Sequence, residues 1–494
     1  MLKDKVYNLK EQTAFLFAGK IFGLAFQILT PIFLVRIFGK EDYGFYQNIN
    51  LIISFTAALI SWNLSTSLYY FYNISEDKSQ LLSQSLLIQL VISLGFSLIF
   101  IISGPQYLDF FQIHSDFRLQ LLIGVSIILF INGDFFESLL IVEKKSKTIL
   151  IYLLFSGFYR FACICTIALI FRDVYFALLA LFSFFALQTF VMFIYIFKKY
   201  RISFKEISKV KLLEQLKYIF PLGLSKIIGE IGNKADKLIF AHFFSKQDYA
   251  LYSVASFRIP FVNLIFPSVS NVIIPQISLM ANEKNYDGAR LLWHKMINIF
   301  SIITIPFLVF SFFTAKELIV LLFTDQYIEA IPIYQIVLLT FLIQIFARGT
   351  IITAFGKTSY FLKIQMVSTF AGIIMGILFI KRFGMLGAAI TYVLTFYLNG
   401  MLQVYASRII LGVSFKDWLP WRSLFVISSL SLFAAIIIIP VKLFIGSNFL
   451  ILLCSFILYL LFVVILFHIF KQVDVKDVTK MLITKYIKRR KEYE

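Results

Sequence analysis

Long apolar runs separated by short polar segments dominate the sequence from residue 13 to residue 470. A helix needs about 20 mostly apolar residues to cross the hydrocarbon core of a bilayer. The pattern therefore predicts an all-α integral membrane protein with about fourteen transmembrane helices, and no segment between them is long enough for a soluble domain. The predicted spans are 13–35, 45–70, 80–103, 117–142, 148–171, 174–197, 214–242, 249–274, 291–314, 330–355, 360–380, 385–407, 421–441 and 447–470.

The composition excludes a soluble protein of this size. Of the 494 residues 60% are hydrophobic and only 15% are charged, whereas a soluble globular chain has roughly a quarter of its residues charged. The net charge of +19 suits nucleic acid, a membrane surface or an anionic substrate, so its meaning depends on where the cations lie. The three cysteines all lie in apolar runs and predict no disulfide framework.

The distribution of lysine and arginine between the loops predicts the orientation. With the N-terminus in the cytoplasm, the inside segments carry 29 of these residues and the outside loops carry 9. Because cytoplasmic loops are enriched in Lys and Arg, both termini are predicted to be cytoplasmic. Most of the positive charge thus sets topology and does not indicate a nucleic-acid partner.

A short repeat recurs at an offset of 206 residues. The segment 38–46 aligns with 244–252, and five of nine positions are identical. In the same register Lys20 aligns with Lys226. Six predicted spans separate the two copies, and an even number gives both copies the same orientation in the membrane, as in parallel transporter repeats.

The repeat predicts two pseudo-symmetric six-helix bundles followed by a terminal pair of helices. The tail after the last span has apolar residues at helical spacing and ends in a basic cluster, so it predicts an amphipathic helix on the inner leaflet or a solvated topology anchor. The predicted parts are an N-terminal lobe 1–197, a basic cytoplasmic linker 198–213, a C-terminal lobe 214–411, a helix pair 412–470 and a basic tail 471–494.

Eight cations fall within or at the edges of predicted spans, and five of them are the better-buried candidates. Each would cost about 2.5–3.5 kcal/mol at the bilayer centre on insertion scales, so we expect them to face a hydrated cavity or ion-pair partners. A cationic cavity of this kind suits a phosphate-bearing substrate. The structural alternative is that those near helix ends extend to the membrane surface. The five are Lys20, Arg160, Lys226, Arg258 and Arg348.

The seventh predicted span carries a polar stripe. Lys226, Glu230, Asn233 and Lys237 follow one another at spacings of four, three and four residues, which places them on one helix face. Lys226 and Glu230 are spaced for an ion pair. We expect this face, including Asn233, to line a substrate cavity.

Three acidic residues are candidates for coupling transport to a cation. Glu230 and Asp236 lie in the seventh predicted span, and Asp134 lies in the fourth. Static ion pairing is the alternative, and we favour it for these residues.

Three segments carry a family resemblance. The motif Arg36-Ile37-Phe38-Gly39-Lys40-Glu41-Asp42-Tyr43-Gly44-Phe45-Tyr46 resembles the loop after the first span of the polysaccharide transporter family of bacterial repeat-unit flippases. The segments 318–330 and 275–278 are similar to that family's sequences before span 10 and at the end of span 8. The family belongs to the multidrug/oligosaccharidyl-lipid/polysaccharide exporter superfamily.

The resemblance implies a two-lobed bundle that works by alternating access. It also implies a substrate, an undecaprenyl-pyrophosphate-linked oligosaccharide, that moves from the inner to the outer leaflet for O-antigen, capsule or exopolysaccharide assembly. Membrane lipids and a polysaccharide polymerase or chain-length regulator are the implied partners. The cavities of the family are cationic, which agrees with Lys20, Lys226, Arg258 and Arg348.

Other functions stay open at this stage. A multidrug exporter would need acidic residues for organic cations, but the first span carries Lys20 and no acid beyond its entrance. A flippase for a peptidoglycan precursor shares the anionic lipid-linked substrate. A membrane-embedded glycosyltransferase or polymerase would need catalytic residues gathered in a sizeable polar loop. The sequence has no such loop, metal-spaced cluster or phosphate-binding glycine loop, so we expect neither an enzyme nor a cofactor.

Overall fold

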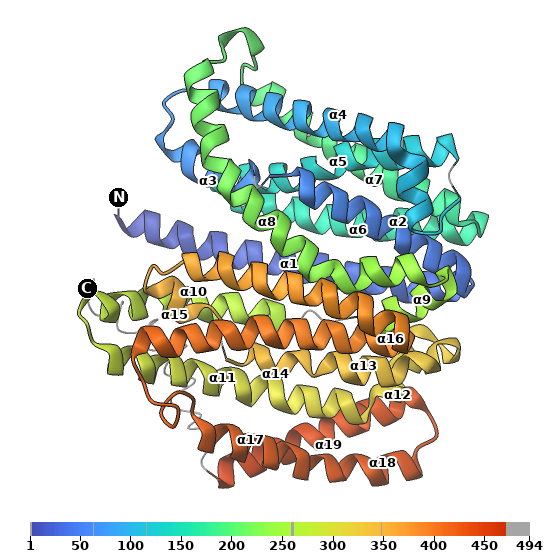
Figure 1. Cartoon of the computed structure of the whole chain (residues 1–494), viewed down its shortest axis with the longest axis vertical. Helices are drawn as coiled ribbons and strands as arrows, with labels where there is room; N and C mark the ends of the chain where they lie inside the picture. The colour runs from blue at the N-terminus through green and yellow to red at the C-terminus, as the bar shows by residue number, and fades with distance from the viewer. Residues whose placement is uncertain (1, 63, 115, 258–260, 347, 471–494) are drawn as a thin grey trace. The chain divides into compact units, whose positions relative to one another are not determined.

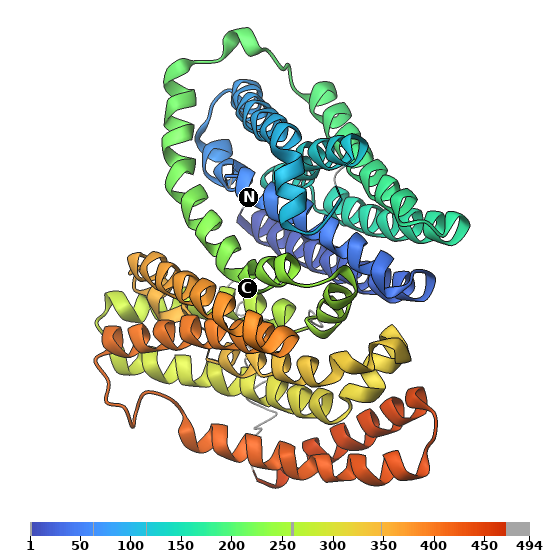
Figure 2. The same ribbon diagram turned by 45° about the vertical axis from the view of Figure 1, so that its right-hand side comes forward.

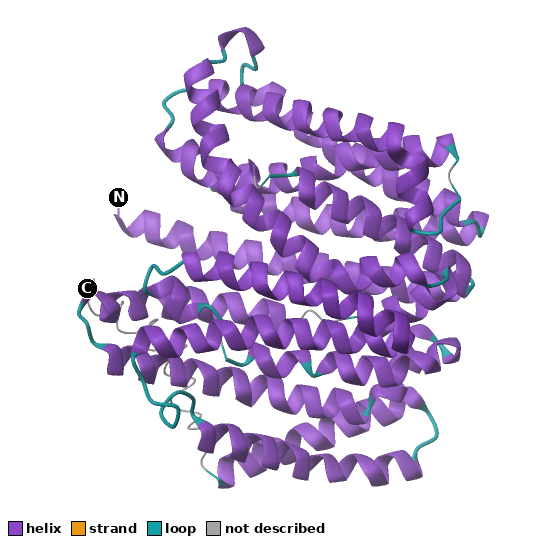
Figure 3. Ribbon diagram, in the orientation of Figure 1, coloured by secondary structure: helices purple, strands orange, loops and turns teal. Residues whose placement is uncertain are grey.

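The computed structural model describes residues 2–470 except 63, 115, 258–260 and 347. These residues form helices joined by short loops, and no strand occurs in the described ranges (Figure 3). Eleven helices among them are long and apolar enough to cross a membrane. The prediction of an all-α, multi-pass membrane protein is therefore confirmed.

The chain divides into two compact units. Unit 1 comprises residues 1–253 and 369–391, and unit 2 comprises residues 254–368 and 392–494. The helices of unit 1 are α1 (Leu2–Ile37), α2 (Lys40–Ile60), α3 (Leu64–Ile74), α4 (Lys78–Phe110), α5 (Phe117–Val142), α6 (Ser146–Phe171), α7 (Val174–Lys199), η1 (Phe204–Glu206), α8 (Lys209–Phe243) and most of α9 (Lys246–Ala255) (Figure 1).

Unit 2 contains the shorter helices of the second half and the terminal pair. Its elements are α10 (Phe261–Asn282), α11 (Tyr286–Phe313), α12 (Ala315–Phe323), η2 (Asp325–Ala330), α13 (Ile331–Leu338), α14 (Thr340–Gln344), α15 (Thr350–Ala354), both ends of α16 (Ser359–Leu411), α17 (Trp421–Ala434), η3 (Ala435–Ile437), α18 (Ile438–Phe444) and α19 (Asn448–Ile469).

Most of the fourteen predicted spans coincide with one helix each, whereas 45–70, 249–274 and 330–355 are each divided among two or three shorter helices. The count of fourteen stays a prediction. One helix, α16, covers the two predicted spans 360–380 and 385–407, with a break at Gly384. The φ of +57° at Gly384 lies in a region that glycine adopts without steric cost. The predicted span 214–242 corresponds to α8, which is not among the eleven apolar helices because it carries many charges.

Helix boundaries repeat at the 206-residue offset found in the sequence. Helix α1 ends at Ile37 and α2 begins at Lys40, while α8 ends at Phe243 and α9 begins at Lys246. Both copies of the motif therefore form the turn between two helices and the first turns of the second one.

Buried amides join α8 to the other helices of unit 1, where it packs against α2 and α3 (Figure 2). The Gln84 Nε2 atom donates to Gln215 Oε1 at 2.9 Å. The Gln215 amide in turn donates to Ser67 Oγ at 3.0 Å and to Ser85 Oγ at 2.9 Å. All four side chains are buried. An amide in hydrocarbon is costly without a partner, so this network fixes the first half of α8 to α3 and α4.

Candidate functional site

The first candidate pocket lies in unit 1 between α2, α5 and α8. Its volume is about 220 Å³. We call it the α8 pocket. It is lined by Ser54, Ala57, Ala58, Ser61, Phe130, Ile131, Asp134, Lys226, Glu230 and Lys234.

Charged side chains of α8 line the wall of this pocket. Lys226, Glu230 and Lys234 are four residues apart, so they lie along one face of the helix. The Lys226 Nζ atom donates to Ser61 Oγ at 2.9 Å. The Lys234 Nζ atom lies 3.6 Å from Glu230 Oε2 and 3.3 Å from Ser54 Oγ. Glu230 therefore pairs with Lys234, and the expected pair with Lys226 is absent.

The second candidate pocket adjoins the first and has a volume of about 210 Å³. We call it the α1 pocket, because α1 provides part of its wall together with α5, α6 and α7. Phe130 and Asp134 line both pockets, so the two cavities share a wall on α5. The polar residues that line the α1 pocket are Gln27, Thr30, Asp134, Glu137, Tyr152, Ser156, Arg160 and Gln188.

Ion pairs and hydrogen bonds hold the polar groups around the α1 pocket. The Lys20 Nζ atom lies 3.2 Å from Glu137 Oε1, and the Lys20 side chain is 48% exposed. The Arg160 guanidinium lies over the Phe184 ring at 5.7 Å and interacts electrostatically with Tyr46. The charged ends of these side chains are thus either exposed or in contact with polar groups inside the helical bundle. Groups that bind a charged ligand need such an environment.

The two pockets together bring four cations and three carboxylates into one region of unit 1. Lys226 and Lys20 both interact electrostatically with Asp134, which lies in the wall between the cavities. Cations with hydroxyl and amide groups beside them can bind a phosphate, which accepts several charge-assisted hydrogen bonds. The seven charged residues are Lys20, Arg160, Lys226, Lys234, Asp134, Glu137 and Glu230.

Other candidates from the sequence lie elsewhere. Asn233 is exposed on α8 but is not in the lining of the α8 pocket. Asp236 is 4% exposed and accepts a hydrogen bond from the Tyr252 hydroxyl. Arg348 belongs to unit 2, where its guanidinium lies 4.2 Å from the centre of the Phe396 ring. Arg258 lies outside the described residues.

Sequence reasoning missed Lys234 and its hydroxyl partners on α2. Lys234 follows Glu230 by four residues, a spacing that favours an ion pair in a helix, so a local signal was present. Ser54 and Ser61 had no such signal, because their role depends on where α2 packs. In the described part of the chain, no group of three or more His, Cys, Asp and Glu side chains could hold a metal ion.

A known protein family matches this chain over residues 33–332, the family of polysaccharide biosynthesis proteins. A capsular polysaccharide biosynthesis protein, CapF, from Staphylococcus aureus is 29% identical over 175 residues. That match covers 35% of this chain and 44% of the relative, so it spans less than half of the relative's length. An uncharacterized membrane protein in the cps region of Klebsiella pneumoniae is 22% identical over 387 residues, 76% of this chain and 77% of the relative.

Solved structures share the fold over most of the chain. The lipid II flippase MurJ in an inward closed conformation matches with a TM-score of 0.66 at 14% identity, covering 94% of this chain and 100% of that protein. An inward-facing multidrug resistance transporter of the MATE family matches with a TM-score of 0.64 at 11% identity, covering 79% of this chain and 94% of that protein. The predicted exporter-like fold is therefore confirmed.

Proposed function

Since the chain belongs to the family of polysaccharide biosynthesis proteins, we propose that it is a flippase for a lipid-linked oligosaccharide. The substrate would be an undecaprenyl-pyrophosphate-linked repeat unit that moves from the cytoplasmic to the outer leaflet of the inner membrane. Translocation by alternating access makes and breaks no covalent bond, so the proposal requires no catalytic residue. The fold shared with the lipid II flippase and the MATE transporter supports a transport role.

The observation that carries this proposal is the set of cations around the two pockets. Lys20 and Arg160 lie on α1 and α6, which are long and apolar enough to cross a membrane, and Lys226 lies on α8, which corresponds to a span predicted from the sequence. Unpaired charge in such segments is costly. A diphosphate would bind beside them through charge-assisted hydrogen bonds.

Internal carboxylates would hold the binding cations until substrate arrives. Glu137 pairs with Lys20, and Glu230 pairs with Lys234. An entering diphosphate would replace these carboxylates as the partner of the lysines, so the positive charges would stay compensated throughout the exchange. The carboxylates would then accept hydrogen bonds from sugar hydroxyls, and Gln27 and Gln188 in the α1 pocket could both accept from and donate to them.

The peptidoglycan-precursor flippase is the main competing function, because the cations of the two pockets would suit any lipid-linked diphosphate. A multidrug exporter is disfavoured, since an organic cation would meet Arg160, Lys226 and Lys234 in the lining of these pockets, with Lys20 beside Glu137. Complementation distinguishes the proposed repeat-unit flippase from a peptidoglycan-precursor flippase. If the proposal is right, this chain should not rescue a strain depleted of its lipid II flippase.

Gene deletion is the first test of the proposal. We expect lipid-linked repeat units to accumulate on the cytoplasmic leaflet while surface polysaccharide disappears, and we expect Lys226→Ala to fail to restore export at a normal membrane level. Lys147→Ala is the control, because Lys147 is exposed and lines neither of the two pockets. Unchanged surface polysaccharide in the deletion strain, or full rescue by Lys226→Ala, would refute the proposal.

Orientation and partners belong to the same proposal. With both termini in the cytoplasm, the basic segment 198–213 would lie inside and the motif at 38–46 would face outside. Maleimide labelling of single cysteines in intact cells checks this: a cysteine at Lys40 should react, and one at Lys205 should not. A polymerase or chain-length regulator would receive the substrate on the outer side.

A further inference from the structure

A wide pocket in unit 2 lies where the last helix pair begins. Its volume is about 750 Å³, and it is open on one side. Its lining includes Lys416, Trp421, Arg422, Ser423 and Phe470. These residues come from the segment before α17, from the first turn of α17 and from the residue after α19. We call this cavity the α17 pocket.

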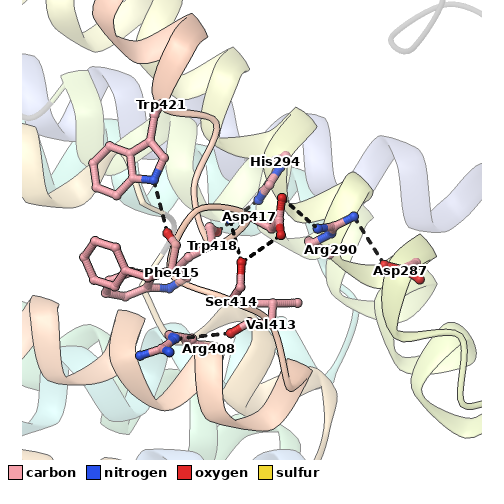
Figure 4. A network of polar contacts seen from close by, with 10 residues as sticks. All are labelled: Asp287, Arg290, His294, Arg408, Val413, Ser414, Phe415, Asp417, Trp418 and Trp421. Carbon is pink, nitrogen blue, oxygen red and sulfur yellow. Dashed lines mark hydrogen bonds and ion pairs between the residues drawn. The ribbon is translucent and has the colours of Figure 1, made fainter.

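The carboxylate nearest in sequence to these cations is held by other groups (Figure 4). Asp417 accepts a hydrogen bond from Ser414 Oγ at 2.8 Å and lies 4.0 Å from Arg290 Nη1. Neither Lys416 nor Arg422 forms an ion pair with a carboxylate in the described ranges. The pocket therefore presents positive charge to a ligand.

Two aromatic residues, Trp421 and Phe470, line the pocket, and a third, Phe415, packs against Trp421. The rings of Phe415 and Trp421 stack with their centres 6.2 Å apart, and the two residues are 59% and 45% exposed. Phe470 is 53% exposed. Exposed aromatic rings beside lysine and arginine are typical of the level at which a membrane helix enters the headgroup region.

The segment before α17 has a fixed conformation although it is not helical. The Trp418 indole donates to the Val404 carbonyl at 3.2 Å, and the Trp418 carbonyl lies 3.0 Å from His294 Nε2. Arg408 Nε donates to the Val413 carbonyl at 3.2 Å. These bonds tie the segment to α11 and α16 within unit 2, so Lys416 and Arg422 are carried on a preorganised frame, which lowers the entropic cost of binding.

We propose that the α17 pocket binds the phosphate headgroup of an anionic glycerophospholipid. Lys416 and Arg422 would contact the phosphate, and Ser423 would donate a hydrogen bond to it. Acyl chains would lie along the apolar surface of α17, where Phe425 is 73% exposed. This site lies in unit 2 and takes a structural lipid, so it is independent of the transport proposal.

Native mass spectrometry of the purified full-length protein in neutral detergent tests the site. Titration with phosphatidylglycerol should show a bound lipid, and titration with phosphatidylcholine at the same concentrations should show less binding. In the Lys416→Ala/Arg422→Ala variant, the affinity for phosphatidylglycerol should fall about 30-fold, because each basic residue near a lipid headgroup contributes roughly a factor of five. The Lys416→Arg/Arg422→Lys variant keeps both charges and should keep binding within about threefold.

The matched control removes two exposed cations of unit 2 outside the pocket. Lys357→Ala/Lys363→Ala changes the net charge equally and should leave the affinity unchanged. An equal loss in this control would indicate diffuse attraction and would overturn the site, as would wild-type affinity in Lys416→Ala/Arg422→Ala. Displacement of phosphatidylglycerol by undecaprenyl diphosphate at a lower concentration would also overturn it, because the pocket would then belong to the transported lipid.

Discussion

Gly44 and Ala250, which occupy equivalent positions in the two copies of the repeat, lie against each other. A Cβ atom on Gly44 would be 3.3 Å from the Ala250 Cβ and only 1.8 Å from the Lys246 carbonyl oxygen. The first turns of α2 and α9 thus approach closely enough that only glycine fits at position 44. The repeated motif is the contact point of its own two copies.

The close approach predicts that Gly44→Ala is destabilising. The added methyl group requires α2 and α9 to separate, and overpacking of this kind costs about 1–3 kcal/mol. Gly95→Ala is the matched control, because nothing lies within 4 Å of a Cβ there and Gly95 is also helical. We expect a lower thermal midpoint for Gly44→Ala in detergent and an equal or higher one for Gly95→Ala. Equal midpoints for the two variants would contradict the contact.

The pair between Lys20 and Glu137 predicts a different result for single and double variants. Lys20→Ala should reduce export of the lipid-linked substrate tenfold or more. The single variant also leaves the Glu137 carboxylate without its cation. The double variant Lys20→Ala/Glu137→Gln removes this unpaired negative charge but still lacks the lysine. Export should stay low in the double variant, as measured by surface polysaccharide at matched protein levels. Recovery in the double variant would show that Lys20 serves only to neutralise Glu137.

An ion pair joins α12 to α18 in unit 2 and predicts a stability effect. The Lys442 Nζ atom lies 2.8 Å from Glu317 Oε1, and the Glu317 side chain is 7% exposed. Because Lys442→Ala strands a buried carboxylate, it should lower the free energy of unfolding by about 2–4 kcal/mol. Lys316→Ala, which removes the exposed neighbouring lysine, should change it by less than about 0.5 kcal/mol. Thermal midpoints of the two variants measure this difference. An equal decrease in both midpoints would contradict the ion pair.

A tyrosine at the end of α7 predicts an alkaline limit. Burial raises the pKa of Tyr200 well above its usual 10.0, and the hydrogen bond that its hydroxyl donates to Glu143 at 2.5 Å adds to this effect. The folded state thus favours the protonated phenol. Its stabilising contribution is complete below about pH 10 and falls as the pH rises further, by roughly 1.4 kcal/mol per pH unit.

Tyr200→Phe should therefore be less stable at pH 8 but lose stability less steeply above pH 10. Denaturant midpoints between pH 8 and pH 11 measure both effects. Tyr218→Phe is the control, because the Tyr218 ring stacks on Tyr70 and its hydroxyl does not bond to Glu143 as that of Tyr200 does. Parallel pH profiles for wild type and Tyr200→Phe would show that the phenol keeps its ordinary pKa.

The sequence was a good guide to elements and a weaker guide to contacts. Apolar runs predicted the helices because a bilayer span has a required length, and the 206-residue offset predicted both helix boundaries near Phe38 and Phe244. The polar face of α8 was also visible, since Lys226 and Glu230 are four residues apart. Whether a residue on that face reaches a pocket depends on its neighbours, and Asn233 does not line the α8 pocket.

Contacts between distant helices could not be predicted. The pairing of Lys20 with Glu137 joins residues 117 positions apart, and no periodicity encodes it. The break between α2 and α3 was likewise missed, because the apolar run 45–70 continues across it. There Trp62 has a φ of +42°, and its backbone and ring lie against Gly223 of α8. The break thus occurs where Trp62 packs against α8, and the local sequence does not indicate it.

The buried amides around Gln215 have a consequence for engineering. They fix α8 to α3 and α4, although the sequence repeat predicts that α8 begins the second lobe. The lobe boundary predicted from the repeat and the boundary of the compact unit at residue 253 thus lie at different places in the chain. A chimera with a relative that is cut in the linker 198–213 would sever these amide bonds, whereas one joined near residue 253 would inherit them whole, together with the charged face of α8.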